Sequence, residues 1–400
     1  MSFPVQPAGQ QTVRQHNLAL VLAELRRSPG SRAHLAQRTG LTKATVASLV
    51  DSLVAQGILD EAEPASSGPG RPARALALDP SGPIGLGIEI NVDYLAAGVV
   101  DLTGRLRGHR HLPADNRSWP VAKIYAEAVA MAQELLADIG QPLLGVGVAV
   151  PAAVNGAGEV VRAPNLPRLA GQRPAEQLAA ALSVDDVLVE NEANLGALAR
   201  LWAAPAAGRD FVYVSGEIGV GAGVVVDGRL FRGVHGFAGE LGHVVIERNG
   251  PPCGCGGRGC LEQYAGQDVL VRTAGQPDLA GLEAAVHRAD RRALHAVEQA
   301  GAALGVGLSS LLNVLDLPMV VLGGLYSRLF EAITPALTSE LSTRVLSSRQ
   351  ASGQVRRSSL GIDAAVRGAA GLIVDRALTE PDRLLAAAAP IDRVSASSGS

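Results

Sequence analysis

The N-terminal part of the chain alternates between helical stripes of apolar residues and short polar breaks. Apolar residues spaced three and four positions apart mark one face of a helix over 11–27 and one face of another over 43–54. Between them, Ser31 can cap a shorter helix that ends at Gly40. A supporting helix followed by two helices with a tight turn predicts a helix-turn-helix, whose last helix enters the major groove of DNA.

Two short apolar runs, 58–60 and 75–78, follow the third helix and predict the two strands of a wing. The loop between them contains Gly68-Pro-Gly-Arg-Pro72, and an arginine held between glycine and proline suits a narrow minor groove. Up to Ser48 the chain has six basic residues against the single acid Glu24, which indicates a phosphate-facing surface and disfavours the alternative, a small helical interaction module. The predicted DNA contacts are Arg32, Thr42, Lys43, Thr45, Ser48 and Arg71.

The rest of the chain has a different pattern. After a DNA-binding domain over 11–79, prolines and a glycine predict a linker at 80–83. From 84 to 384, strand-like runs alternate with helix-rich sequence, and the hairpin sequence of 97–106 returns at 222–230, which indicates an internal repeat. Buried apolar runs at 143–150, 187–190 and 319–322 favour α/β layers. The Ala- and Ser-rich end, 385–400, is expected to be disordered.

Composition adds limits to this picture. A chain of 400 residues with 47% hydrophobic residues can form two or three domains with a large core. A net charge of −3 indicates no particular class of partner, so only local charge is informative. The N-terminus lacks a signal-like apolar region, and the longest apolar run, 143–150, is too short to cross a bilayer. The cysteines of the chain are placed as metal ligands. Such thiols fit a reducing compartment, so a cytoplasmic location is expected.

All three cysteines of the chain lie close together in a glycine-rich segment. Cys253, Cys255 and Cys260 follow His243, and three thiolates with one imidazole form the ligand set of a closed tetrahedral zinc site. The alternative is a set of buried structural cysteines, but small apolar residues are normally scattered through a core. Four protein ligands leave no position for a water, so the zinc is expected to be structural. Glu240 and Glu262 flank the segment and could accept hydrogen bonds from a polyhydroxylated ligand.

The spacing of this segment resembles the signature of the ROK family of repressors, open reading frames and sugar kinases. The matching residues are Glu-x-Gly-His at 240–243 and Cys-x-Cys-Gly-x-x-Gly-Cys-x-Glu at 253–262. The resemblance implies that the histidine and the cysteines bind zinc while both glutamates and the histidine face a sugar. It also implies an actin-like, hexokinase-like fold of two ribonuclease H-like lobes, and the N-terminal segment resembles the winged helix-turn-helix of the family's repressors, including the Gly-Arg-Pro of the wing.

The segments that resemble the kinases' phosphate loops are altered. Kinases of this fold carry Asp-x-Gly-Gly-Thr-Lys, whose glycines let the backbone approach phosphates, whereas this chain has Glu-Ile-Asn-Val-Asp-Tyr at 89–94. The second loop, 215–221, keeps its glycines but places Glu217 where ATP phosphates would lie. In the family's Glu-Asn-Asp-Ala-Asn motif, the aspartate is the catalytic base. Glu192 replaces it here and would be displaced by one methylene, although it can still accept a hydrogen bond.

These observations predict a sugar-responsive transcriptional regulator, a repressor, without enzymatic activity, and the chain resembles a ROK repressor throughout. The predicted sugar contacts are Asn165, Asn191, Glu192, Glu240, His243 and Glu262, with helix capping as the alternative role of the first three. The expected partners are operator DNA, a sugar or sugar phosphate, and a second copy of the chain, since one winged helix has a small footprint. The alternatives are a sugar kinase with an added DNA-binding domain, which the altered first loop disfavours, and a ligand-independent regulator.

Overall fold

The computed structural model describes residues 9–62, 74–347 and 355–388. The N-terminal domain is a winged helix, as predicted. Ser31 accepts a hydrogen bond from the His34 amide at the start of the second helix, and Gly40 ends that helix with a φ of 73°. Its elements are α1 (Gln10–Arg27), α2 (Arg32–Thr39), α3 (Lys43–Ala55), β1 (Leu59–Ala62) and β2 (Ala75–Leu78). The centre of the wing loop, including Arg71, lies outside the described residues.

The remaining chain forms two lobes, each built on a five-stranded sheet. The first sheet has the order β5-β4-β3-β6-β9 and the second β12-β11-β10-β13-β14. In both, an antiparallel meander of three strands is extended by two parallel strands on its first member. The predicted internal repeat is therefore a repeat of topology, and the two-lobed α/β fold is confirmed.

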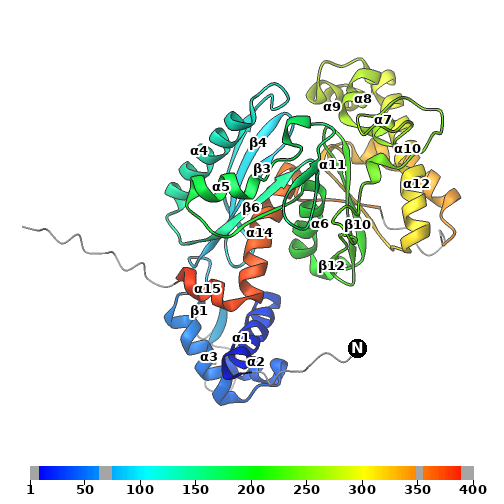
Figure 1. Ribbon diagram of the computed structural model, residues 1–400. Coiled ribbons are helices and arrows are strands. Elements are labelled where there is room, and N and C mark those ends of the chain that lie inside the picture. The colour runs from blue at the N-terminus through cyan, green and yellow to red at the C-terminus, as the bar shows by residue number, and fades with distance from the viewer. Residues whose placement is uncertain (1–8, 63–73, 348–354, 389–400) are drawn as a thin grey trace, which may run out of the picture.

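The first lobe (Figure 1) contains the cyan sheet and the helices on its two faces. Its strands are β3 (Ile84–Ile90), β4 (Tyr94–Val100), β5 (Leu106–Pro113), β6 (Leu143–Val150) and β9 (Val187–Asn191), and its helices are α4 (Val121–Ile139), α5 (Pro174–Leu182) and α14 (Ala364–Thr379). Branched residues of β3 pack on one face in a cluster with α4. On the other face, Gly85, Gly87 and Gly147 leave room for α14, because a Cβ at Gly87 would lie 2.2 Å from the Val366 carbonyl oxygen.

The second lobe places its sheet between α6 on one face and a group of helices on the other. Its strands are β10 (Phe211–Gly216), β11 (Val220–Val226), β12 (Arg229–Leu230), β13 (Val320–Gly323) and β14 (Val355–Arg357). Its helices are α6 (Glu192–Ala203), α7 (Glu262–Ala265), α8 (Gln267–Ala274), α9 (Leu279–His287), α10 (Arg291–Leu315), α11 (Gly324–Arg328) and α12 (Phe330–Arg344). A small hairpin of β7 (Ala153–Val154) and β8 (Val160–Arg162) extends from the first lobe.

The winged helix and the first lobe share one hydrophobic core. Leu18 and Leu22 of α1 are fully buried in a cluster that also contains Val374 and Leu378 of α14. Arg26 forms an ion pair with Asp375 at the same junction. Figure 1 shows α14 running from the first lobe down to α1, so the DNA-binding domain is packed directly on the lobe.

The segments predicted as a linker and as the start of a disordered tail both contact the rest of the protein. The segment 80–83 is held in place, because Gly82 and Pro83 are buried and the Pro80 carbonyl accepts hydrogen bonds from Arg107 and Gln141, each at 3.2 Å. The expected disordered tail from 385 begins inside α15 (Pro381–Ala388), a helix whose Leu384 is fully buried in the shared core. Residues 389–400 lie outside the described part of the chain.

Among the described residues, no helix is both long enough and apolar enough to span a bilayer.

Candidate functional site

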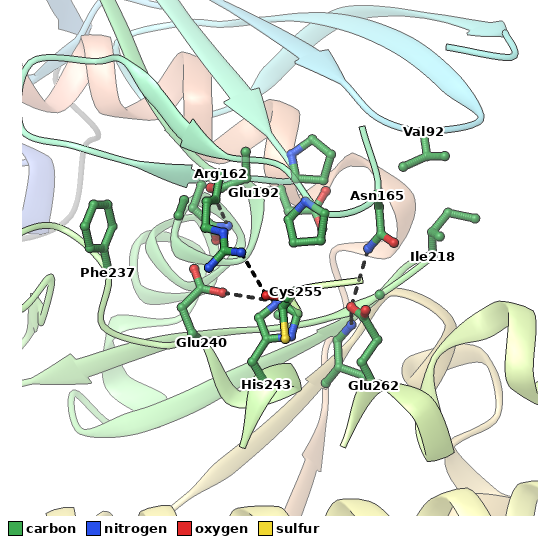
Figure 2. A pocket seen from close by; sticks show the side chains of 18 of the residues that line it. Val92, Arg162, Asn165, Glu192, Ile218, Phe237, Glu240, His243, Cys255 and Glu262 are labelled. Carbon is green, nitrogen blue, oxygen red and sulfur yellow. Dashed lines mark hydrogen bonds and ion pairs between the residues drawn. The ribbon is translucent and has the colours of Figure 1, made fainter. Parts of the chain in front are cut away.

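A cavity of about 360 Å³ lies between the two lobes and is lined by residues of both. The structure brings every predicted sugar contact to this cavity, from segments far apart in the sequence (Figure 2). The six residues that line it as predicted are Asn165, Asn191, Glu192, Glu240, His243 and Glu262. The tertiary structure thus brings these six residues together, whereas their role as sugar ligands stays a prediction.

The junction of β9 and α6 contributes two of these residues in different ways. The Asn191 side-chain oxygen accepts hydrogen bonds from the amides of Ala193 and Asn194 at 2.9 and 3.2 Å, and its amide donates to the Ala152 carbonyl at 3.2 Å. Asn191 therefore caps α6, the alternative that its sequence position suggested. Glu192 begins the helix, is 9% exposed and accepts one hydrogen bond, from Asn91 Nδ2 at 3.1 Å.

Glu262 and Asn165 face each other across the cleft between the lobes. Asn165 comes from the loop after β8, and its Nδ2 donates to Glu262 Oε2 at 3.4 Å. The same Glu262 oxygen accepts the Val220 amide at 3.4 Å. Both contacts are long for hydrogen bonds, so this carboxylate retains the capacity to accept from hydroxyl groups of a ligand.

The predicted metal ligands form a compact cluster beside the cavity. The donor atoms of His243, Cys253, Cys255 and Cys260 all lie within 4.8 Å of one another. Cys255 Sγ lies 3.7 Å from Cys260 Sγ, and Cys253 Sγ lies 3.7 Å from His243 Nδ1. Tetrahedral zinc with Zn–S bonds of about 2.3 Å separates its sulfurs by roughly 3.8 Å. The four side chains therefore fit a metal ion of this kind.

The two nitrogens of His243 face different neighbours. Nδ1 points to the cysteines, while Nε2 lies 3.9 Å from Glu240 Oε2 at the cavity. One imidazole can therefore ligate a metal through Nδ1 and present Nε2 to the cavity, which reconciles the two roles that the sequence suggested for it.

Sequence reasoning missed two side chains that line the same cavity. Arg162 at the end of β8 donates to the Cys255 carbonyl at 2.8 Å, so it reaches from the first lobe to the metal-binding loop. Phe237 lies in the glycine-rich segment before Glu240 and is 37% exposed. Figure 2 shows its ring on the Glu240 side of the cavity. Its place in a glycine-rich segment, 233–239, was the sequence feature that could have indicated an exposed aromatic side chain.

The two segments that resemble the kinases' phosphate loops bring Glu89 and Glu217 close to Glu192. Glu89, Glu192 and Glu217 line a second cavity of only about 10 Å³ next to the first, which is the space of roughly one water. Burial raises the pKa of Glu89 to about 7, and burial together with the charge of Glu89 raises that of Glu192 to about 8. Burial and the charge of Glu192 also hold the pKa of Glu217 well above its usual range.

Some of the predicted DNA contacts are exposed to solvent, whereas Arg32 forms ion pairs within the protein. Thr42 caps α3 by accepting the Thr45 amide at 3.1 Å, and Lys43 and Ser48 are exposed on the same helix. Arg32 instead pairs with Asp51 at 2.8 Å and with Glu61, so acidic neighbours already occupy its guanidinium. Both acids lie after Ser48, in α3 and in β1, so the excess of basic residues up to Ser48 did not indicate this pairing.

The chain was compared with known proteins. The ROK family profile matches residues 85–376. The xylose repressor of Bacillus subtilis (strain 168) is 32% identical over 387 residues, which cover 93% of this chain and 98% of that protein. A ROK family transcriptional regulator described as a homologue of the E. coli MLC protein has a similar fold, with a TM-score of 0.77, 22% identity and coverage of 94% of this chain and 98% of that one. A ROK family glucokinase from Streptomyces griseus, solved with glucose and AMPPNP, has a TM-score of 0.64 and 26% identity, covering 72% of this chain and 98% of its own.

The raised pKa values predict how stability depends on pH. Glutamate in the unfolded chain has a pKa near 4.5, so the folded state, with Glu192 near 8, binds this proton more tightly. The contribution of this bound proton to the stability of the folded state is complete below about pH 4.5 and is lost as the pH rises through about 8. Replacing Glu192 with Gln should leave the free energy of unfolding nearly unchanged at acidic pH and raise it at pH 9, by on the order of 1–3 kcal/mol. Denaturant titrations across this range measure the effect.

Glu298→Gln is the matched control, because that side chain is 71% exposed on α10. Its pH profile should parallel that of the unmodified protein. Equal dependence on pH in Glu192→Gln and in the unmodified protein would contradict the assignment of a raised pKa to Glu192.

Proposed function

Because this chain belongs to the ROK family and carries an N-terminal winged helix, we propose that it is a sugar-responsive, DNA-binding transcriptional repressor. Both parts occur in one packed molecule, and this carries the proposal: a helix-turn-helix with an exposed start of α3, and an interlobe cavity lined by the six predicted polar residues and by others. The similarity to a Bacillus subtilis xylose repressor spans both parts, since it covers 93% of this chain.

The charge of the cavity favours a neutral monosaccharide as effector. Glu240 and Glu262 line it together with Glu192, whose raised pKa keeps it protonated at neutral pH. The arginine in the lining, Arg162, is already bound to a backbone carbonyl. Carboxylates accept hydrogen bonds from hydroxyl groups but repel a phosphate. Relatives of this chain are named xylose repressors, so xylose is the first sugar to test.

The sugar kinase is the alternative function, and some relatives at lower identity are named glucokinases. Two features oppose it. Val92, the buried Glu89 and the half-buried Glu217 occupy the segments expected to hold phosphates, and the cavity next to Glu89 and Glu217 has room for about one water. A protonated or misplaced Glu192 is also a poor substitute for an aspartate base.

We therefore expect no phosphorylation of xylose or glucose in the presence of ATP and magnesium. A coupled assay for ADP measures this, with a known sugar kinase as the positive control. Turnover at an ordinary kinase rate, on the order of 1 per second, would overturn the repressor-only function.

Helix α6 offers a route from the sugar to the DNA-binding domain. It begins in the cavity with Glu192 and ends near Trp202, whose ring lies 5.4 Å from the Arg26 guanidinium of α1. Between these ends it packs tightly on α14, since a Cβ at Gly368 would lie 2.0 Å from the Leu195 carbonyl oxygen. A movement of α6 on sugar binding would therefore be passed to the junction with α1 rather than absorbed.

The response to sugar tests the proposal directly. Xylose at saturation should weaken operator binding by about 5- to 150-fold, because an effector that prefers one conformation by roughly 1–3 kcal/mol shifts DNA affinity by that factor. Glu240→Ala should retain operator binding and lose the response, since it removes an acceptor at the cavity. Fluorescence anisotropy with operator DNA, at one fixed salt concentration, measures both.

Two controls make this result specific. Glu298→Ala removes an exposed acid of α10 and should leave the response intact. Lys43→Ala should weaken operator binding while sugar affinity stays unchanged, because Lys43 is exposed at the start of α3. Equal operator affinity with and without every neutral monosaccharide tried would refute the proposal. We further propose that the protein binds a two-fold operator as a homodimer.

We propose zinc as the ion held by His243 and the three cysteines. A closed site would fix the loop that carries Glu240 at one end and Glu262 at the other, without any open position for catalysis. Purified protein should contain one zinc per chain by elemental analysis. Cys255→Ser should release it and weaken sugar binding about tenfold or more, since the loop also holds the Arg162 contact. Full sugar affinity in the zinc-free protein would contradict this role.

A further inference from the structure

A third cavity, separate from the interlobe site, lies where the winged helix meets the two lobes. Its volume is about 270 Å³, close to the lower end of small-ligand pockets. Its walls come from α1, the turn between β4 and β5, α6 and α14. The residues that matter for its chemistry are Arg26, Thr103, Trp202, Leu360, Arg367 and Gly371.

The charge of this cavity is positive. Arg26 and Arg367 line it, and none of the described residues lining it is acidic. Arg26 is paired with Asp375, which leaves the charge of Arg367 in excess. Arg200 donates to the carbonyl oxygens of Ala204 and Ala207, just after α6, at 3.2 and 2.8 Å and does not line the cavity. The side chains that line the cavity therefore give it a net positive charge.

The side chain of Arg367 has a hydrogen-bond donor without a partner among the described residues. Its Nε is buried and has no acceptor within hydrogen-bond distance among the described residues. A buried guanidinium N–H without an acceptor is costly, because the group has lost its water and gained no partner. An anion placed against Arg367 would satisfy this donor, and guanidinium groups bind phosphate oxygens through paired hydrogen bonds.

Apolar side chains form another part of the lining. The Trp202 ring lies against α14 because position 371 is glycine, where a Cβ would be 2.7 Å from the indole. Leu360 borders the same space. The cavity thus combines a site for an anionic group with a surface for the carbon body of a ligand.

From this geometry we propose that the junction cavity is a second effector site, which binds the phosphate monoester of a small metabolite such as a sugar phosphate. The phosphate lies against Arg367 and Arg26, and the body of the ligand packs on Trp202. Because Arg26 belongs to α1 and Arg367 to α14, the bound ligand would tie the winged helix to the lobes. This site takes an anion, whereas the interlobe cavity, which contains Glu240 and Glu262, takes a neutral sugar.

Isothermal titration of the full-length protein tests the assignment, with glucose 6-phosphate, inorganic phosphate and glucose as probes. Glucose 6-phosphate should bind the unmodified protein, and Arg367→Gln and Arg367→Ala should each weaken that binding about tenfold or more. Arg291→Ala is the matched control, because Arg291 is exposed at the start of α10. Glu240→Ala should keep full affinity for glucose 6-phosphate, which separates this site from the interlobe cavity.

Melting temperatures of the variants identify any loss of affinity that comes from unfolding, and Arg367→Gln keeps most of the side-chain volume. Unchanged glucose 6-phosphate affinity in both folded Arg367 variants would overturn the site. So would the absence of binding by either phosphate probe at concentrations up to about 10 mM. Equal affinity for inorganic phosphate and glucose 6-phosphate would overturn the role of the Trp202 wall. These outcomes do not depend on whether xylose is the effector of the interlobe cavity.

Discussion

The close packing of α14 against backbone is the constraint on which the rest of this molecule depends. Glycines of β3 and β6 let the helix lie directly on the first sheet, and Gly368 brings it against α6. Added side chains at these positions would collide with carbonyl oxygens, which cannot rotate away. One helix therefore fixes the distance between the first lobe, the start of the second lobe and the winged helix.

This packing determines which segments would transmit a conformational change from the lobes to the winged helix. The predicted linker at 80–83 is itself fixed to the first lobe, because the Pro80 carbonyl accepts hydrogen bonds from Arg107 and Gln141 and because Gly82 and Pro83 are buried. The DNA-binding domain instead rests on a shared apolar core with α14 and α15. Rigid elements in contact transmit small shifts more effectively than a flexible linker, because a packed interface cannot deform continuously.

The cleft between the lobes contains two neighbouring spaces of different size and lining. The acceptors for hydroxyl groups remain at the interlobe cavity, whereas the neighbouring space contains three carboxyl groups and almost no volume. Burial favours the protonated form of these groups, so they can remain together without a cation to balance them. Protonation makes such a cluster compatible with a closed, neutral interior.

Local patterns in the sequence determined the helix-turn-helix, the repeated hairpins and the set of metal ligands, because each depends on residues near one another in the chain. Ser31, Gly40 and the spacing of the cysteines act within one turn or one loop, and the structure has them as predicted. The meeting of Asn165 with Glu262, the capture of Arg32 by Asp51 and Glu61, and the junction cavity of Arg26 and Arg367 were decided only by tertiary structure. Such contacts join segments that are distant in sequence, and their formation depends on how whole sheets and helices pack.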